Sequence, residues 1–256
     1  MSLNFRLLAA AAATSALLLL PAPSRAQTFS DTQRGEIEKI IKDYLISHPE
    51  VLEQASAELE KRKQLAEAEK AKTQIASNAK TLFYSPRQVT IGDTKGEVTL
   101  VEFFDYNCGY CKRALSDLTT IMKDDPKLRV VLKEFPVLGP GSVEAAKVAV
   151  AVRMQDAGNK YFKFHQLLLG GRGQADEARA LQAAKDAGFD MTRIRKDMQS
   201  DEVKAEIDEN MKLAEALSLS GTPSYVVGSE VVVGAVGLDA LKQKVNMARC
   251  GKATCS

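Results

Sequence analysis

The stretch Val101–Leu115, VEFFDYNCGYCKRAL, places Cys108 and Cys111 directly after a run of apolar and aromatic residues. Such runs are typical of strands, so we expect a buried strand that ends near Phe104 and a helix that begins at Cys108. A Cys-x-x-Cys pair alone is a weak signal of function. Between a buried strand and a helix, however, the pair is a strong indication of a redox dithiol.

The expected place of Cys108 on the first turn of a helix predicts its chemistry. A helix N-terminus favours negative charge and so lowers the pKa of a thiol, and the thiolate is the reactive form. We expect the Cys108 sulfur to be exposed to a substrate disulfide, with Cys111 on the same side of the helix to resolve the mixed disulfide. Gly109 and Tyr110, between the cysteines, are expected to contact the substrate and to tune the thiolate.

The second cysteine pair, Cys250 and Cys255, lies in a polar tail without a preceding buried strand. We expect a structural disulfide here, which the loop-entropy argument values at about 2 kcal/mol. The same interpretation of Cys108 and Cys111 is less favoured, because so small a ring stabilises the fold little. A zinc site that joins both pairs would need four thiolates within tetrahedral reach, although one pair lies at the far end of the chain. We expect no resident metal and no cofactor.

Residues 1–26 have the layout of a secretory signal peptide. Arg6 precedes the apolar run Leu7–Leu20, and small residues lie before the expected cleavage site. The apolar run is short for a bilayer span, although a retained anchor is an alternative. The mature chain is then expected to begin near Gln27 and to work in an oxidising compartment, where disulfides persist.

The charge balance argues against nucleic acid as a partner. The chain has 35 lysines and arginines and 33 acidic residues, which gives a formal charge of +2. Arg6 and Arg25 lie in the expected signal peptide, so the mature chain carries no net charge. A chain without net charge has no general electrostatic attraction for a polyanion.

Residues 27–82 are expected to form a helical arm. The sequence SDTQ, Ser30–Gln33, fits a capping box, and the first helix should end before Pro49. A second helix with a thin apolar stripe is expected to run on to Lys80. The simplest interpretation of the arm is a solvated linker, and the alternative is an oligomerisation arm. The case for the alternative rests on the apolar face of the first helix, which consists of Ile37, Ile40, Ile41 and Leu45.

From residue 83 onward the apolar patterns predict an α/β fold. Their order is strand, helix and strand, a helical insertion over about residues 140–218, and then two strands and a helix. The two late strands, joined through Gly228 and Ser229, are expected to form an antiparallel hairpin. The last helix of the insertion is expected to bury one face that consists of Val203, Ile207, Met211 and Ala214.

Three segments resemble known redox proteins. The segment LVEFFDYNCGYCK, Leu100–Lys112, resembles the active-site segment of the thioredoxin superfamily in its DsbA-like periplasmic branch. The sequence GTPS, Gly221–Ser224, resembles the cis-proline loop that faces the dithiol in this superfamily. The segment Ile37–Ala55 resembles the N-terminal segment of the ScsC family, the suppressor-of-copper-sensitivity thiol–disulfide proteins. The resemblance implies that residues 83–256 form a thioredoxin fold that contains an inserted helical domain.

The resemblance also implies roles for single residues. Cys108 would be the attacking cysteine and Cys111 the resolving one. Pro223 would be the cis-proline, and the backbone of Thr222 beside it would pair with a bound polypeptide. Glu102 falls where the superfamily keeps a buried acid that moves protons to and from the second cysteine.

Partners and location follow from the same resemblance. ScsC-like proteins are periplasmic, some are trimeric through the N-terminal segment, and a membrane protein typically keeps them reduced. We therefore expect a homo-oligomer, with a trimer as the first candidate, formed through residues 27–82. Threonine before the cis-proline is common in disulfide isomerases, so Thr222 favours an isomerase or reductase that acts on misfolded secreted proteins. A DsbA-like oxidase is the alternative. Because soft thiolates select Cu(I), a Cu(I)-binding chaperone is an alternative of another class.

Three polar residues near the expected site are interpreted more simply. Asp105 is a loop acid that would oppose ionisation of Cys108, and it lies outside the predicted catalytic set. His165 lies among aromatic residues at helical spacing and is expected to be a packed helix residue. Lys112 either favours the thiolate or belongs to a solvated helix face.

Overall fold

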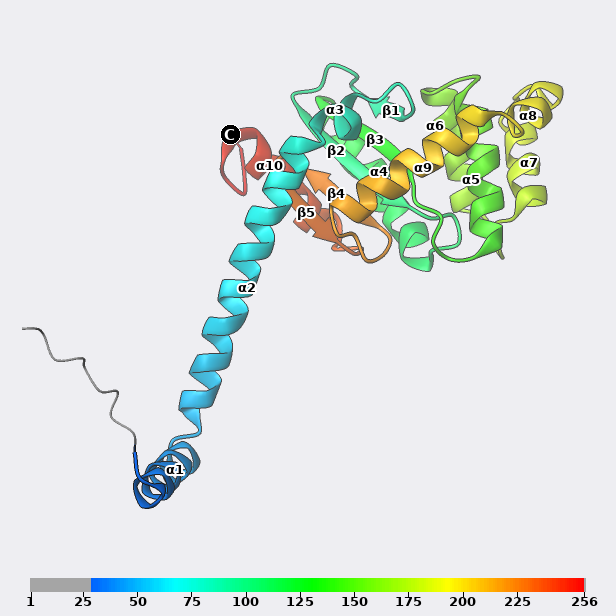
Figure 1. Ribbon diagram of the computed structural model, residues 1–256. Helices are drawn as coiled ribbons and strands as arrows, with labels where there is room; N and C mark the ends of the chain where they lie inside the picture. Colours follow the sequence, from blue (N-terminus) through cyan, green and yellow to red (C-terminus); the bar gives the residue numbers. More distant parts are fainter. Residues whose placement is uncertain (1–28, 256) are drawn as a thin grey trace, which may run out of the picture. The chain divides into compact units, whose positions relative to one another are not determined.

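The computed structural model describes residues 29–255 and divides them into two units (Figure 1). One unit ends at Glu58 and the other begins at Leu59. The expected signal peptide, residues 1–26, lies outside the described residues. Within residues 29–255, no helix combines the length and the apolarity that crossing a bilayer requires.

The first N-terminal helix begins and ends where the sequence predicts, whereas the second ends at Ser77, three residues before the predicted Lys80. Helix α1, Asp31–Ser47, starts with a capping box in which the Ser30 hydroxyl and the Gln33 side chain each accept a backbone N–H of the other residue. It ends at His48, because Pro49 disfavours a helical conformation in the residue before it. Helix α2, Glu50–Ser77, follows directly. No residue of α1 is buried, and on its apolar face Ile37, Ile40 and Ile41 are exposed and Leu45 is half-buried.

The larger unit is built on a five-stranded mixed sheet with the order β1-β3-β2-β4-β5. Strands β2 and β3 are parallel, and every other neighbouring pair is antiparallel. Strands β4 and β5 form the predicted hairpin, with Gly228 in the left-handed region at its turn. The strands are β1 Val89–Gly92, β2 Val98–Phe104, β3 Leu128–Glu134, β4 Ser224–Val227 and β5 Glu230–Val233.

Helices cover both faces of this sheet, and five of them lie between β3 and β4 in the sequence (Figure 1). These five, α5 to α9, occupy the part of the chain in which we expect the helical insertion. The helices of the larger unit are α3 Ala79–Tyr84, α4 Gly109–Asp124, α5 Pro140–Arg153, α6 Asn159–Leu169, α7 Glu177–Asp186, α8 Met191–Asp197, α9 Asp201–Ala216 and α10 Leu238–Cys250, beside the C-terminal part of α2.

The two faces of the sheet have separate cores. Alternate residues of a strand point to opposite faces, so Leu100 and Phe104 of β2 lie on one face and Val101 and Phe103 on the other. The first two pack with Cys111 of α4, and we call their side of the sheet the dithiol face. The other two pack with buried residues of α3 and α9, and we call that side the α9 face.

The predicted buried face of α9 is partly wrong. Val203 and Ala214 are buried, but Ile207 is only half-buried and Met211 is exposed. In their place α9 buries the polar residues Glu206 and Asn210, together with Leu213. A buried carboxylate needs a partner, and Glu206 lies 2.5 Å from the guanidinium of Arg153 on α5. Apolar periodicity could not identify this face, because an ion pair occupies part of it.

Candidate active site

Cys108 lies at the beginning of α4, where its sulfur has two polar neighbours. It is the N-cap residue, and its Sγ accepts a hydrogen bond from the backbone N–H of Cys111 at 3.3 Å. The thiol also donates to the carbonyl oxygen of Thr222, with 3.1 Å between the sulfur and the oxygen. The N-terminal end of α4, which is the positive end of the helix dipole, therefore faces the sulfur.

The expectation that the Cys108 sulfur is exposed is wrong for this structure, because only 4% of the residue is accessible. The physical reason is the loop that contains Thr222, whose carbonyl oxygen lies 3.1 Å from the sulfur. Attack on a substrate disulfide therefore requires close approach at this loop.

Cys111 is fully buried and, like Cys108, is a free thiol in the structure. Burial raises the pKa of the Cys111 thiol well above its usual value. The hydrogen bond to Cys108 and the charges of Glu102 and Cys108 add to this rise. The Cys111 thiol therefore stays protonated until a base removes its proton, as the predicted mechanism requires.

The loop before β4 brings a cis-proline against the dithiol. The peptide bond between Thr222 and Pro223 is cis. The Ser224 hydroxyl donates to the carbonyl of Gly221 at 2.7 Å, and the Pro223 carbonyl accepts the N–H of Gly234 at 2.8 Å. These bonds fix both sides of the loop, so the Thr222 carbonyl is held at the Cys108 sulfur.

Glu102 is an isolated carboxyl group beneath the dithiol. It lies on β2, is 2% accessible, and has no hydrogen-bond partner for its Oε2 within residues 29–255. Burial raises its pKa to about 8. Because its charge contributes to the raised pKa of the Cys111 thiol, the two groups are coupled. A carboxyl group with a pKa near neutrality, close to a buried thiol, can exchange a proton with it.

Asp105 holds the loop that precedes Cys108, a role that our sequence analysis missed. Its Oδ1 accepts hydrogen bonds from the N–H of Asn107 at 2.7 Å and the Ser142 hydroxyl at 2.8 Å. Its Oδ2 accepts the N–H groups of Val137 and Leu138 at 2.9 and 3.0 Å. The carboxylate is fully engaged by these donors, so it supports the site. An Asp two residues before the N–H it binds is an Asx-turn signal that the sequence contains.

A family profile described as the DSBA-like thioredoxin domain matches residues 99–246, which is more than half of the chain. The chain belongs to this family. A second profile, the N-terminal domain of the copper resistance protein ScsC, matches residues 33–66. The resemblances to DsbA-like and ScsC proteins are therefore confirmed. Cys108 and Cys111 both lie within the residues that the DSBA-like profile matches.

Two solved structures of similar proteins agree with this assignment. A thioredoxin-like oxidoreductase from Silicibacter pomeroyi is 42% identical, with a TM-score of 0.64, and the match covers 67% of this chain and 98% of that one. A linker-deletion mutant of ScsC from Proteus mirabilis is 27% identical, with a TM-score of 0.65. That match covers 87% of this chain and 97% of that one, so it includes part of the N-terminal helices.

The first curated relatives are much longer proteins. The Na⁺/H⁺ antiporter NhaA 1 of Salinispora arenicola is 29% identical over 162 residues, which are 62% of this chain but 24% of that protein. The chain therefore spans about a quarter of the length of such a relative. The shared part corresponds in size to the DSBA-like domain.

The sequence neighbours of the two cysteines differ in their exposure and in their contacts. Gly109 and Tyr110 are exposed, and the Tyr110 ring is 60% accessible, so both can meet a substrate. The Arg113 guanidinium lies 4.3 Å from the centre of that ring. The Lys112 ammonium donates to the carbonyls of Gly171 and Gly173 at 3.3 and 3.0 Å, so it is tied to the loop after α6.

The remaining residues singled out by the sequence lie in structural positions. His165 packs against Phe104 and Tyr106 and is fully buried, and burial lowers its pKa to about 3, so it stays neutral. Cys250 and Cys255 form a disulfide that closes the tail after α10. Cys108 and Cys111 are thus the two free cysteines among residues 29–255.

Proposed function

We propose that the protein is a periplasmic disulfide isomerase and reductase that acts on misfolded secreted proteins through a mixed disulfide at Cys108. The observation that carries this proposal is the position of the Cys108 sulfur, between the first turn of α4 and the Thr222 carbonyl beside the cis-proline. Threonine before the cis-proline is the residue that favours isomerases in this superfamily. The disulfide of Cys250 and Cys255 supports an oxidising compartment.

The first chemical step is attack on a client disulfide. The Cys108 thiolate forms a bond to one client sulfur, the client disulfide breaks, and the second client sulfur leaves as a thiolate. Ionisation of Cys108 also frees the Thr222 carbonyl from the thiol, so that it can accept a backbone N–H of the client. This backbone pairing would hold the client while its cysteines exchange partners.

Two outcomes can follow the mixed disulfide. In isomerisation another client thiolate attacks the client sulfur, and Cys108 leaves with its electron pair, still reduced. In reduction Cys111 loses its proton to Glu102 and attacks Cys108, which releases the client as a thiol and leaves the protein oxidised. A thiol reductant in the membrane would then donate two electrons and restore the dithiol. Reductase and isomerase activity therefore differ in the use of Cys111.

The N-terminal helices would supply the second requirement of an isomerase, several sites around one client. We propose that residues 27–82 assemble the chain into a homo-oligomer, with a trimer as the first candidate. Ile40 and Ile41 of α1 are exposed, and this segment matches the ScsC N-terminal domain. Large apolar residues that gather on one exposed face are typical of an interaction surface.

The first experiment is reactivation of scrambled ribonuclease by the reduced chain without residues 1–26. We expect recovery of ribonuclease activity that Cys108→Ser abolishes and Cys111→Ser largely retains, because shuffling needs only the attacking thiol. No recovery, together with rapid oxidation of a reduced client by the disulfide form, would establish an oxidase instead. Inactivity in both assays, with tight stoichiometric Cu(I) binding, would favour the copper chaperone.

The arm is tested by the mass of the protein in solution. Ile40→Glu combined with Ile41→Glu places two charges on the apolar face of α1 and should convert the oligomer to monomers. Lys42→Glu, an exposed residue of the same helix, is the matched control and should leave the mass unchanged. If the unsubstituted chain is itself a monomer, the oligomer proposal is wrong.

A further inference from the structure

Tyr225 is a buried tyrosine on the strand next to Glu102. It lies on β4 directly opposite Glu102 of β2, and the two strands are antiparallel. Directly opposed residues of an antiparallel pair project from the same face of the sheet with their side chains close together. Tyr225 belongs to the core that also contains Cys108 and Cys111, and none of its surface is accessible. The tyrosine therefore shares the dithiol face with the carboxyl group.

The hydroxyl of Tyr225 has no hydrogen-bond partner within residues 29–255, and neither does Oε2 of Glu102. Two buried polar side chains that lie opposite each other on neighbouring strands therefore each have an atom without a hydrogen-bond partner. The two other fully buried tyrosines differ, because the hydroxyls of Tyr106 and Tyr161 bond to each other at 3.2 Å and Tyr161 also donates to Glu134. A buried hydroxyl without a partner destabilises a fold, and a phenylalanine would fill the same space without that cost.

The ionisable groups whose charges act on Tyr225 are all potential hydrogen-bond acceptors. They are Glu102, directly opposite on β2, and Cys111, Asp117 and Cys108 of α4. Burial raises the pKa of Tyr225, and these four groups add to the rise, so the phenol keeps its proton throughout the reaction. The other elements that pack on it contribute apolar residues: Val232 lies opposite on β5, and the buried residues of α10 are Leu241 and Val245. A permanent hydrogen-bond donor therefore lies directly opposite Glu102, in the core that contains both cysteines.

We propose that Tyr225 is a positioning residue for proton transfer at the dithiol, and that its hydroxyl donates a hydrogen bond to the Glu102 carboxylate while that carboxylate takes the proton of Cys111. The inference rests on the proposed function. In the resolving step the proton moves from the Cys111 thiol to Glu102, and the resulting thiolate bonds to Cys108. The bond between Cys108 and the client then breaks, and the client sulfur leaves as a thiolate. Tyr225 keeps its own proton in this step.

The consequence is a specific pH dependence. A hydrogen bond to the charged form of an acid favours that form, so the hydroxyl raises the fraction of Glu102 that is ionised and able to act as a base. Without the hydroxyl, Glu102 should ionise only at higher pH. The resolving step should then slow at neutral pH, whereas the attack by Cys108 should not change.

The test uses the aromatic disulfide dithionitrobenzoate, which releases a coloured thiolate at each of two steps. Attack by Cys108 on the reagent releases the first, and attack by Cys111 on the mixed disulfide releases the second. We expect Tyr225→Phe to slow the second release about tenfold at pH 7 and to move its pH midpoint upward by about one unit, the effect of one hydrogen bond to a charged group. The first release should stay within about twofold of the unsubstituted protein, since the hydrogen bonds of the Cys108 sulfur are to the Cys111 N–H and the Thr222 carbonyl and do not involve Tyr225.

Two comparisons separate positioning from packing. Tyr161→Phe removes a hydroxyl from another fully buried tyrosine and should leave the pH midpoint of the second release unchanged. In a chain that already carries Glu102→Gln, Tyr225→Phe should have no further effect, because the hydroxyl acts through the carboxylate. Tyr225→Leu provides a second chain without the hydroxyl if the phenylalanine variant does not fold.

The inference is overturned if the second release and its pH midpoint are the same in Tyr225→Phe and in the unsubstituted protein. It is also overturned if both releases slow equally, which would indicate a general disturbance of the site. Failure of the proposed function is distinct. In that case the unsubstituted protein would give no rapid first release that depends on Cys108.

Discussion

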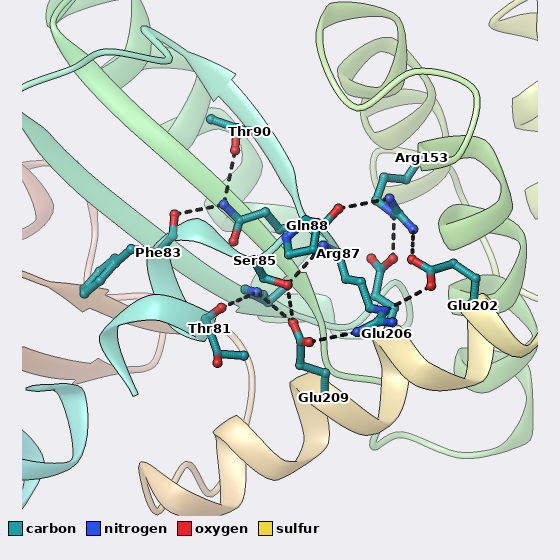
Figure 2. A network of polar contacts seen from close by, with 12 residues as sticks. Thr81, Phe83, Ser85, Arg87, Gln88, Thr90, Arg153, Glu202, Glu206 and Glu209 are labelled. Carbon is teal, nitrogen blue, oxygen red and sulfur yellow. Dashed lines mark hydrogen bonds and ion pairs between the residues drawn. The ribbon is translucent and has the colours of Figure 1, made fainter. Parts of the chain in front are cut away.

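Two buried carboxyl groups, Glu102 on the dithiol face and Glu206 on the α9 face, have opposite surroundings. On the dithiol face, Oε2 of Glu102 has no partner among residues 29–255. On the α9 face, Glu206 lies 2.5 Å from Arg153, which also bonds to Glu202 at 3.0 Å (Figure 2). The ammonium of Lys133 is fully buried there and donates to the Thr81 carbonyl at 3.1 Å. We call this set the α9 charge cluster; it consists of Arg87, Lys133, Arg153, Glu202, Glu206 and Glu209.

The difference indicates a different role for each of the two carboxyl groups. Burial raises the pKa of Glu102 to about 8, and no positive charge opposes the rise. Burial also raises the pKa of Glu206, but the charges of Arg153 and Lys133 oppose it. An unpaired carboxyl group can gain and lose a proton near neutral pH, which suits catalysis. The paired groups instead join α9 and α5 to β3 and to the segment after α3.

The largest expected effect tests the paired side of this comparison. Arg153→Met should lower the free energy of unfolding by about 3–5 kcal/mol, because it leaves Glu206 buried without its partner. Urea unfolding at neutral pH would measure the loss. Arg193→Met is the control, since Arg193 forms an exposed pair with Asp197 and should contribute about 1 kcal/mol or less. Equal losses in the two variants would contradict the difference between the cluster and an ordinary surface pair.

The next effect tests the unpaired side through pH. The pKa of Glu102 is raised in the folded state from 4.5 to about 8, so the stability it contributes is complete below pH 4.5 and is lost as pH rises toward 8. Glu102→Gln, which cannot ionise, should therefore be more stable than the unsubstituted protein by about 3 kcal/mol at pH 7. At pH 4 the two proteins should differ little. A constant difference between pH 4 and pH 8 would mean that Glu102 does not titrate in this window.

The smallest effect compares one hydroxyl from each face. At pH 5, where Glu102 is protonated in the folded protein and offers no carboxylate, Tyr225→Phe removes a hydroxyl without a partner and should raise the free energy of unfolding by about 1 kcal/mol. Ser85→Ala removes a hydroxyl that bonds to Glu209 and accepts the N–H of Arg87 at 3.0 Å, and it should lower stability by about the same amount. Thermal unfolding of both variants would show whether each substitution raises or lowers the stability. Two losses would show that the hydroxyl of Tyr225 has a partner in solution.

The sequence predicted the dithiol and its setting because local patterns determine them. A β-branched and aromatic run predicted β2, and the cysteine spacing predicted the pair at the start of α4. The capping box at Ser30 and the end of α1 before Pro49 were also local, and both are confirmed. Each of these features depends on residues within a few positions of one another.

Features that depend on distant partners could not be predicted in this way. The burial of Glu206 requires Arg153, which lies on another helix, and the burial of Lys133 requires a carbonyl of the segment before β1. The exposure of Cys108 was mispredicted for the same reason, because the Thr222 carbonyl that faces its sulfur lies 114 positions later. Apolar periodicity describes one helix at a time, so it cannot reveal these partners.

The contacts of the Asn107 side chain restrict how the helical insertion can be exchanged in an engineered protein. Its Oδ1 accepts the N–H of Ala175 at 2.7 Å, and its Nδ2 donates to the carbonyl of the same residue at 2.8 Å. This single amide mimics a backbone pairing between the loop before Cys108 and the loop before α7. The helical insertion is therefore not an interchangeable module, and a chimera that exchanges it must transplant the Ala175 loop together with Asn107.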